Sequence, residues 1–188
     1  MDFPPRRTAL KEATADAHAA LDSLVGNFRT LDDYKRYLAG IAAFRIPVEA
    51  WLADTELPLD LKGYEPHRVH AELEADLCDL NTRPPTDQPA FKPPEGDGIV
   101  GLLYVLEGSA LGARLLAKRA ETLGLSADFG ARHLFSQARN FSSWRAFSER
   151  MENVGVYDYQ AAARWANTAF DYARSAFESA LNAECSFR

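Results

Sequence analysis

Apolar positions recur at helical spacing along most of this chain, and no segment shows the strict alternation that is typical of a strand. A first helix is expected over residues 8–23. A long second helix is expected after Thr30, which with Asp33 has the pattern of a capping box, and Pro47 is expected to bend it. The pattern therefore predicts an all-α fold.

A polar, proline-rich stretch interrupts the helical pattern in the middle of the chain. It follows a third helix that is expected to begin at Pro66, a residue suited to the first helical turn, and to end near Asn81. The stretch itself, over residues 81–98, is expected to be an extended connection. It is not interpreted as a domain boundary, because neither flank could bury its helices alone.

The second half of the chain returns to helical spacing. A long apolar helix is expected over residues 99–120, two or three shorter helices over 127–154, and a last helix over 158–181 with Asp158 as its cap. No internal repeat is visible. Residues 1–188 are therefore predicted to form a single-domain helical bundle.

Three glycines lie inside the expected helix over residues 99–120, although each costs about 1 kcal/mol relative to alanine in a helix interior. The spacings of Gly101, Gly108 and Gly112 place them within roughly 20° of one line along the helix. This helix therefore has a face without side chains, against which something flat or bulky can lie. A second helix could also approach closely at the Gly108-x-x-x-Gly112 spacing, and alone that is the simpler interpretation.

One histidine has the surroundings that an iron ligand needs. His18 is on the apolar face of the first helix, Asp22 follows at i+4, and Lys11 lies two turns earlier on the same side. A carboxylate that orients one imidazole nitrogen fixes the tautomer and leaves the other nitrogen for a metal. The alternative is a buried histidine satisfied by Asp22, with Lys11 in solvent. His18 and the bare helix together could hold a planar macrocycle between them.

Three blocks of this chain resemble the haem oxygenases. Residues 10–14 (LKEAT) followed by His18 and Asp22 look like the proximal helix of that family, and residues 108–112 (GSALG) look like its distal helix. Residues 166–170 (ANTAF) resemble a segment of its last helix. The sequence around the distal block is most similar to the bacterial branch of the family that is often associated with bacteriophytochromes.

The resemblance implies roles for residues that match the family's pattern. His18 would be the axial iron ligand and the metal-binding residue, and Lys11 would pair with a haem propionate. Phe170 would pack near the ring. Gly108 and Gly112 would lie over the iron, where they would both bind haem and take part in catalysis.

Other positions depart from the family or match it loosely. Asp22 falls where the family usually has a glutamate, so its shorter side chain is expected to need a bridging water. Ser109 stands where many members have an aspartate that organises distal water; its hydroxyl is expected to hold a water and to act in catalysis. Ala113 replaces a glycine. Thr14, in the proximal block, and Arg145, a candidate for the second propionate, are also expected at the cofactor.

The function implied by the resemblance is that of a haem oxygenase, with haem as both substrate and cofactor. Such an enzyme opens the ring to biliverdin and releases carbon monoxide and ferrous iron, using O2 and external electrons. The electron donor would be a ferredoxin or a flavin reductase, and a bacteriophytochrome could receive the biliverdin. The alternative is a haem-binding or haem-storage protein of the same fold without efficient turnover.

Composition limits the remaining classes. The 188 residues carry a net charge of −6 and no basic stripe, which argues against nucleic-acid and membrane-surface partners. The start of the chain does not have the pattern of a signal peptide. Glu107 and Arg114 interrupt the apolar helix, which is therefore expected to be buried in a soluble protein. Cys78 and Cys185 form no metal or disulfide pattern, so a cytoplasmic protein with reduced thiols is expected.

Further readings of single residues stay open at this point. A same-fold thiamin-related hydrolase would need a cysteine nucleophile in the core, and a di-iron oxidase would need several inward carboxylates and histidines. His67, His70 and Glu74 could share one helix face and bind a metal, although a solvated surface is favoured. His133 is expected in a loop or on the surface.

Overall fold

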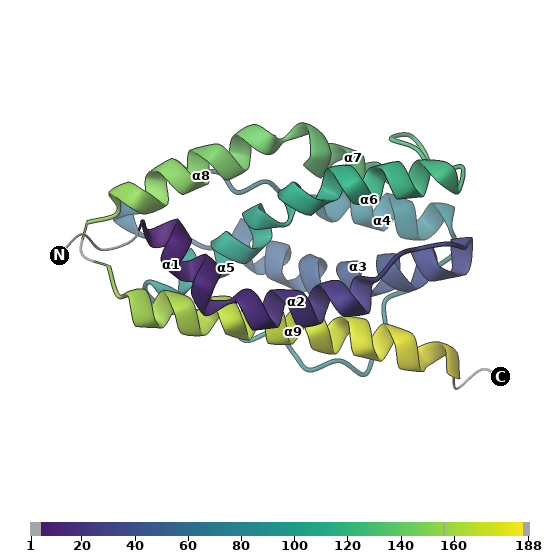
Figure 1. Cartoon of the computed structure of the whole chain (residues 1–188), viewed down its shortest axis with the longest axis horizontal. Helices are drawn as coiled ribbons and strands as arrows, with labels where there is room; N and C mark the ends of the chain where they lie inside the picture. The colour runs from purple at the N-terminus through teal and green to yellow at the C-terminus, as the bar shows by residue number, and fades with distance from the viewer. Residues whose placement is uncertain (1–4, 156, 186–188) are drawn as a thin grey trace.

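The computed structural model describes residues 5–155 and 157–185. Within those residues the chain is helical and has no strand, only an isolated bridge between Ser126 and Gly130. The all-α prediction is therefore confirmed. In chain order, the elements are α1 (Arg6–Ala13), α2 (Ala15–Val25), α3 (Leu31–Ala53), the short 3₁₀ helix η1 (Leu59–Leu61), α4 (His70–Asp79), α5 (Gly98–Gly108), α6 (Ala110–Thr122), α7 (Arg132–Arg139), α8 (Phe141–Asn153) and α9 (Tyr159–Cys185) (Figure 1).

The last helix organises the bundle. α9 packs against α2, α3 and α5, while α6 packs on α7 and α4 on α3. In Figure 1, α2 and α9 run along one side, α7 and α8 along the other, and α5 and α6 cross between them. Two clusters of buried apolar side chains form the core, and they meet at Leu21 and Ile41, which pack against both.

Glycines allow two helices to pack closely against α9. A Cβ atom on Gly101 of α5 would lie 2.0 Å from the carbonyl oxygen of Ala162, and one on Gly40 of α3 would lie 2.6 Å from the Phe177 ring. Both distances are far below van der Waals contact, so neither position has room for a side chain. At Gly101, therefore, α9 fills the face that was expected from the sequence to be open.

The first predicted helix is divided at Thr14, which separates α1 from α2. Thr14 is 2% exposed, and its hydroxyl donates a hydrogen bond to the Leu10 carbonyl at 2.8 Å, where its own backbone N–H also donates at 3.0 Å. A threonine that bonds back to the carbonyl four residues earlier bends a helix. The prediction of one continuous helix over residues 8–23 was therefore wrong.

The apolar helix is also divided, at Ser109, so the prediction of one helix with three aligned glycines was wrong. α5 ends at Gly108, and α6 starts at Ala110. Over the combined length Gly98–Thr122 the helices are long and apolar enough to cross a membrane, but 56% of the most apolar window is buried inside the protein. A core helix meets the same criterion, as the sequence predicts.

Several local predictions are confirmed. Thr30 and Asp33 form the capping box at the start of α3. α3 continues through Pro47 to Ala53, and the bend at Pro47 stays a prediction. The Asp158 carboxylate accepts a hydrogen bond from the Ala161 backbone at the start of α9.

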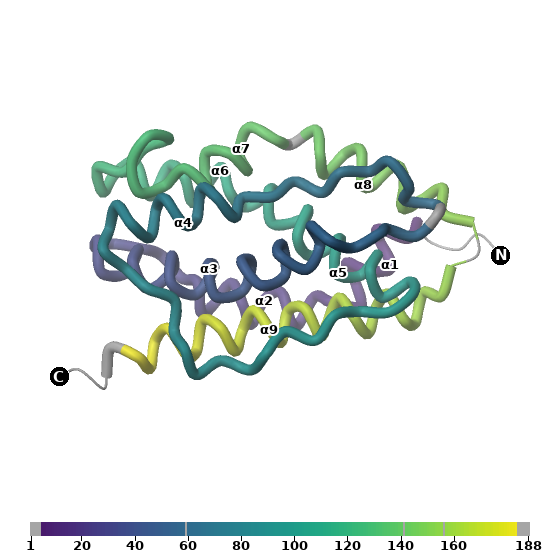
Figure 2. The backbone as a smooth tube through the Cα atoms, turned by 180° about the vertical axis from the view of Figure 1, so that it is seen from behind, coloured from purple at the N-terminus to yellow at the C-terminus, as the bar shows by residue number. Residues whose placement is uncertain are grey.

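The connection between α4 and α5 is extended, as predicted, and Figure 2 shows it running along α9. The ring of Phe91 in this connection packs against Trp51 and Tyr172.

The predicted start of the third helix at Pro66 was wrong, because α4 begins only at His70. The backbone N–H groups of His67 and Val69 donate instead to the carboxylates of Glu107 and Glu49, both at 2.8 Å. Since these acceptors lie on α5 and α3, tertiary contacts hold the segment before α4 out of the helix.

Candidate functional site

His18 and Asp22 form a direct pair on α2. The His18 Nδ1 atom lies 3.0 Å from Asp22 Oδ2, so the expected bridging water is not needed. The two side chains are 61% and 68% exposed, and the alternative of a buried, fully satisfied histidine is therefore wrong. Because Asp22 engages Nδ1, Nε2 is the ring nitrogen left for a ligand.

Phe170 of α9 packs against the His18 ring. The two ring centroids are 5.6 Å apart at an interplanar angle of 67°, which is an edge contact. Phe170 is 6% exposed and therefore a rigid neighbour for the imidazole. In the same block, the Asn167 side-chain amide donates to the Ala13 carbonyl at 3.1 Å, which ties α9 to the bend before α2. Sequence reasoning did not single out Asn167.

The start of α6 presents bare backbone. A Cβ atom on Gly112 would meet nothing within 4 Å, and one on Gly108 would meet only the Trp144 ring, at 3.6 Å. Beside them, Leu111 and Leu115 are 51% and 56% exposed, which is unusual for large apolar side chains only four residues apart. These leucines were missed, although their i, i+4 spacing next to the glycines was a visible signal.

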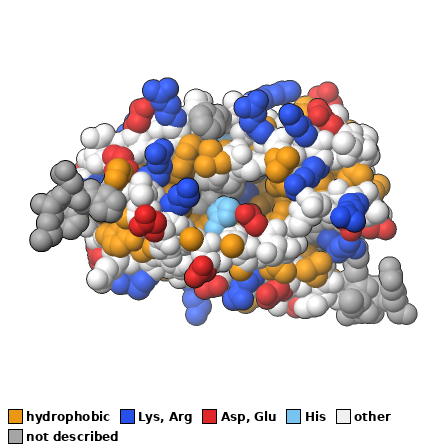
Figure 3. Space-filling model, viewed as in Figure 1, with side chains coloured by type: hydrophobic (Ala, Val, Ile, Leu, Met, Phe, Trp, Pro, Cys, Tyr) orange, Lys and Arg blue, Asp and Glu red, His pale blue; other side chains and the backbone are white. Residues whose placement is uncertain are grey.

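A hollow lies between these two regions. Figure 3 shows the face between α2 and α6 hollowed, with hydrophobic side chains inside and a histidine beside the opening. His18 is the histidine of α2. The geometry suits a flat apolar ligand that is approached by an imidazole from one side and by backbone from the other.

The Ser109 hydroxyl does not take the role that the sequence predicts. It donates to the Leu106 carbonyl at 2.6 Å and accepts from Arg45 Nη1 at 2.9 Å and from Gln137 Nε2 at 2.8 Å. A hydroxyl has one donor and two acceptor positions, and all three are used inside the protein. It therefore has no hydrogen bond left for a water over the iron. Neither Arg45 nor Gln137 was predicted.

A second polar cluster lies behind Gly108. Glu107, which is 3% exposed, accepts from the Ser143 hydroxyl at 2.6 Å as well as from the His67 backbone, and the Tyr64 hydroxyl lies 3.1 Å from Ser143. Burial raises the pKa of Tyr64, and the nearby Glu107 charge raises it further, so this phenol stays protonated at neutral pH.

The remaining predicted site residues are less closely gathered. Lys11 is exposed on α1. Thr14 is buried at the bend, and its hydroxyl donates to the protein backbone. Arg145 is on α8 with its side chain 78% exposed, in a surface ion pair with Glu149 at 3.0 Å. The structure thus brings His18, Asp22 and Phe170 together.

The alternative metal site is not supported. His67 precedes α4, and its Nε2 lies 3.2 Å from the Ser136 hydroxyl, while His70 pairs with Glu74 at 3.3 Å. Among the described residues, no group of three or more His, Cys, Asp or Glu side chains could hold a metal ion.

His133 is not a loop or surface residue, so that prediction was wrong. It is 0% exposed on α7, with Nδ1 at 2.8 Å from the buried Asp76 carboxylate. Of the cysteines, Cys78 is free and exposed, and the side chain of Cys185 lies outside the described residues.

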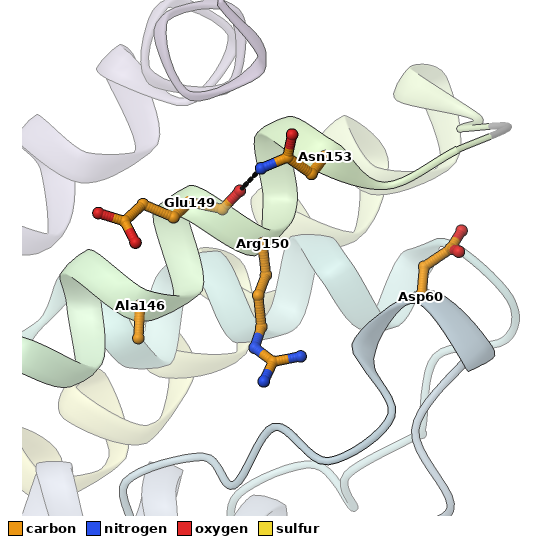
Figure 4. A pocket seen from close by; sticks show the side chains of 5 residues that line it. All are labelled: Asp60, Ala146, Glu149, Arg150 and Asn153. Carbon is orange, nitrogen blue, oxygen red and sulfur yellow. Dashed lines mark hydrogen bonds between the residues drawn. The ribbon is translucent and has the colours of Figure 1, made fainter.

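Two further pockets lie elsewhere. One has a volume of about 480 Å³ between α8 and the η1 region and is lined by Asp60, Ala146, Glu149, Arg150 and Asn153 (Figure 4). The other, of about 170 Å³, is lined by Leu24, Val25, Gly26, Asn27, Asp33, Arg36, Tyr37, Phe177 and Leu181. Neither lining includes His18 or the glycines of the α5–α6 break, and the first mixes opposite charges in the manner of an ordinary surface groove.

Comparisons with known proteins agree with this geometry. No protein-family model matches the chain. The curated heme oxygenase PigA of Pseudomonas aeruginosa is 29% identical over 176 residues, and the alignment covers 88% of each chain. The crystal structure of the NO- and CO-bound heme oxygenase from Neisseria meningitidis matches with a TM-score of 0.80 and 25% identity, covering 96% of this chain and 94% of that one. The chain thus has the haem oxygenase fold.

Proposed function

We infer that this chain is a bacterial haem oxygenase, acting as a single domain, which opens haem to biliverdin and releases carbon monoxide and ferrous iron. The observation that carries this function is the pairing of an exposed His18, held at Nδ1 by Asp22, with the open backbone at Gly112 across an apolar hollow. The likeness to the Pseudomonas and Neisseria enzymes supports the same conclusion.

The residues present suit haem. A flat ring needs one wall free of side chains, and a Cβ atom on Gly112 would fill open space in that wall. The exposed Leu111 and Leu115 would be covered by the apolar ring. The free Nε2 of His18 has the chemistry of an axial iron ligand, and Asp22 would keep the imidazole in the required tautomer. Phe170 would limit rotation of the His18 ring.

Bound haem would supply the iron and the ring carbon that react with O2. His18 would ligate as a neutral imidazole, which lacks the strong electron donation of a thiolate. Gly108 and Gly112 would leave space for O2, and Leu111 would exclude bulk water from part of the hollow. Because the Ser109 hydroxyl proton is bonded to Leu106, we propose that protons come from water that enters the hollow.

The residues that would bind the haem propionates, the electron donor, the cellular location and the biliverdin acceptor are also part of the proposal. Lys11 and Arg145 are the cations offered to the propionates. We propose a ferredoxin or a flavin reductase as the external electron donor, since this sequence contains no nucleotide-binding motif of its own. The free thiol of Cys78 supports a reducing, cytoplasmic location. Delivery of biliverdin to a bacteriophytochrome rests on the sequence resemblance.

A haemin titration tests the axial ligand. Wild-type protein should give the Soret band of histidine-ligated haem, and H18A should lose it. The free energy of unfolding of H18A should stay within about 0.5 kcal/mol of the wild-type value, because the His18 side chain is exposed. H70A is the matched control, since His70 also pairs with a carboxylate at i+4. An unchanged haem spectrum in H18A would remove His18 from the site.

Turnover separates the enzyme from a haem-storage protein. With reductant and O2, the loaded wild-type protein should lose the Soret band and develop biliverdin absorption, with release of carbon monoxide. Stable haem that is never opened would instead favour storage.

A further inference from the structure

A buried cation lies behind the backbone of residues 108–112, which we call the distal wall of the hollow. Arg45 of α3 is 1% exposed, and its Nε donates to Glu49 Oε1 at 2.5 Å; Glu49 is also 1% exposed. Burying an ion pair carries a large desolvation cost, which is offset only when the geometry is good and the remaining hydrogen bonds are made. Such a pair contributes little stability by itself, so the partners of its other N–H groups matter.

Those partners are at the break between α5 and α6. Arg45 Nη1 donates to the Ser109 hydroxyl at 2.9 Å and to the Leu106 carbonyl at 3.3 Å, and Nη2 donates to the His67 carbonyl at 3.1 Å. One guanidinium therefore contacts the last turn of α5, the residue of the break, and the segment before α4. A planar fork is suited to hold several acceptors in one fixed arrangement, whereas a lysine ammonium is not.

The break is also held from other directions. Gln137 of α7 donates to the same Ser109 hydroxyl, and Glu107 ties the end of α5 to Ser143 of α8. The Ser109 hydroxyl in turn donates to the Leu106 carbonyl, one turn earlier. Arg45 is the charged member of this set that reaches both Leu106 and Ser109.

The break changes what the glycines face. Before it, Gly101 is pressed against α9, while beyond it Gly112 faces open space. The direction of α6 at this point determines how close the bare backbone comes to a ring in the hollow.

We propose that Arg45 is a positioning residue of the distal wall, which holds the α5–α6 break through Ser109 and Leu106 and thereby sets the position of Gly108 and Gly112 over the haem. This role rests on the proposed function. Arg45 influences which ring edge faces bound oxygen without touching it.

The first test needs no haem. R45K keeps a cation beside Glu49 but cannot span Ser109, Leu106 and His67. In hydrogen–deuterium exchange of the apo protein, peptides over residues 106–112 should exchange about tenfold faster in R45K than in wild type. This is the ratio expected for loss of a hydrogen bond to a charged group. R6K is the matched control, because Arg6 also donates to backbone carbonyls at a helix end, those of Met151 and Val154 on the α8 side.

The second test uses the haem complex. R45K should keep the histidine-ligated Soret band but change the carbon monoxide dissociation rate and the ratio of biliverdin isomers, and R6K should change neither. If R45K does not fold, S109A tests the same contact from the other side. Unchanged exchange over residues 106–112 together with unchanged isomer ratios would overturn the role of Arg45. A wild-type protein that does not bind haem would instead overturn the proposed function.

Discussion

Two histidine–aspartate pairs in this protein have nearly the same contact and opposite surroundings. His18 and Asp22 are 3.0 Å apart and more than half exposed, whereas His133 and Asp76 are 2.8 Å apart and 0% exposed. In the buried pair, both ring nitrogens of His133 have partners, since Nε2 lies 3.4 Å from the Tyr37 hydroxyl. In the exposed pair, Asp22 engages one nitrogen, and the other remains for a ligand.

The buried pair is part of the framework. The Asp76 carboxylate also accepts from the backbone N–H groups of Arg132 and His133, at 3.0 and 3.1 Å, so it joins α4 to the start of α7. A histidine with every nitrogen engaged and no exposure has nothing to offer a substrate. The comparison teaches that the same residue pair stabilises the fold when both ring nitrogens have partners, and leaves one ring nitrogen available to a ligand when only one of them does.

The largest expected effect is on the buried pair. D76A leaves the His133 ring and the backbone N–H groups of Arg132 and His133 without their acceptor, so it should reduce the free energy of unfolding by about 3–5 kcal/mol. Urea denaturation followed by circular dichroism measures this. D171A is the control, because Asp171 forms an exposed ion pair with Arg174 and should change stability by less than about 1 kcal/mol. A D76A protein as stable as D171A would mean that the two pairs do not differ as described.

The exposed pair should respond in the opposite way. D22A should leave the free energy of unfolding within about 0.5 kcal/mol of wild type, because both side chains are exposed. It should weaken haem affinity by roughly 10–100-fold, as expected when the carboxylate that orients a ligating histidine is removed. Haemin titration of D22A beside E74A, which removes the partner of His70, measures the difference. Equal affinities in the two variants would contradict the orienting role of Asp22.

The smallest effect is on the pH dependence of stability. Burial lowers the pKa of His133, so the unfolded chain binds more protons than the folded one below about pH 6.5. Stability is therefore complete above that pH and falls as the pH drops toward the folded pKa. Burial, followed by the charge of Arg45, also lowers the pKa of His67, which adds to the same trend.

H133N tests this, because the asparagine amide can still donate to Asp76. Its stability should fall less steeply than that of wild type between pH 7 and pH 5, by up to about 1.4 kcal/mol per pH unit. Urea midpoints at several pH values measure the slope. The carboxylates with lowered pKa, Asp33 and Asp79, titrate below this range and should not interfere. Parallel slopes in the two proteins would show that His133 does not carry the pH dependence.

Local signals in the sequence predicted much of the framework. The capping box at Thr30, the cap at Asp158 and the proline-rich connection depend on neighbours in the chain, and each was predicted where the structure has it. Breaks were predicted less well. The bend at Thr14 has a local cause that sequence reasoning overlooked, whereas the late start of α4 depends on Glu49 and Glu107 from distant helices.

The predictions for the site differ in the same way between local and distant contacts. His18 and Asp22 are one helical turn apart, so their pairing could be predicted from spacing, although a bridging water was expected between them. The environment of His133 depends instead on Asp76, which lies 57 residues away. Ser109 was predicted to hold water from its match to the family's pattern. Its actual hydrogen-bond partners, Arg45 and Gln137, are distant in the chain and cannot be read from adjacent positions.

The sequence by itself determined the helical class, most helix ends that have local caps, and the contact between His18 and Asp22, because each depends on neighbours within a turn or two. The tertiary structure decided which glycine has another helix packed against it and which faces open space. Gly101 and Gly112 have the same place in the pattern, yet one lies against the Ala162 carbonyl and the other against empty space. Free space is a property of what several distant segments leave unoccupied, and no spacing along one helix contains it.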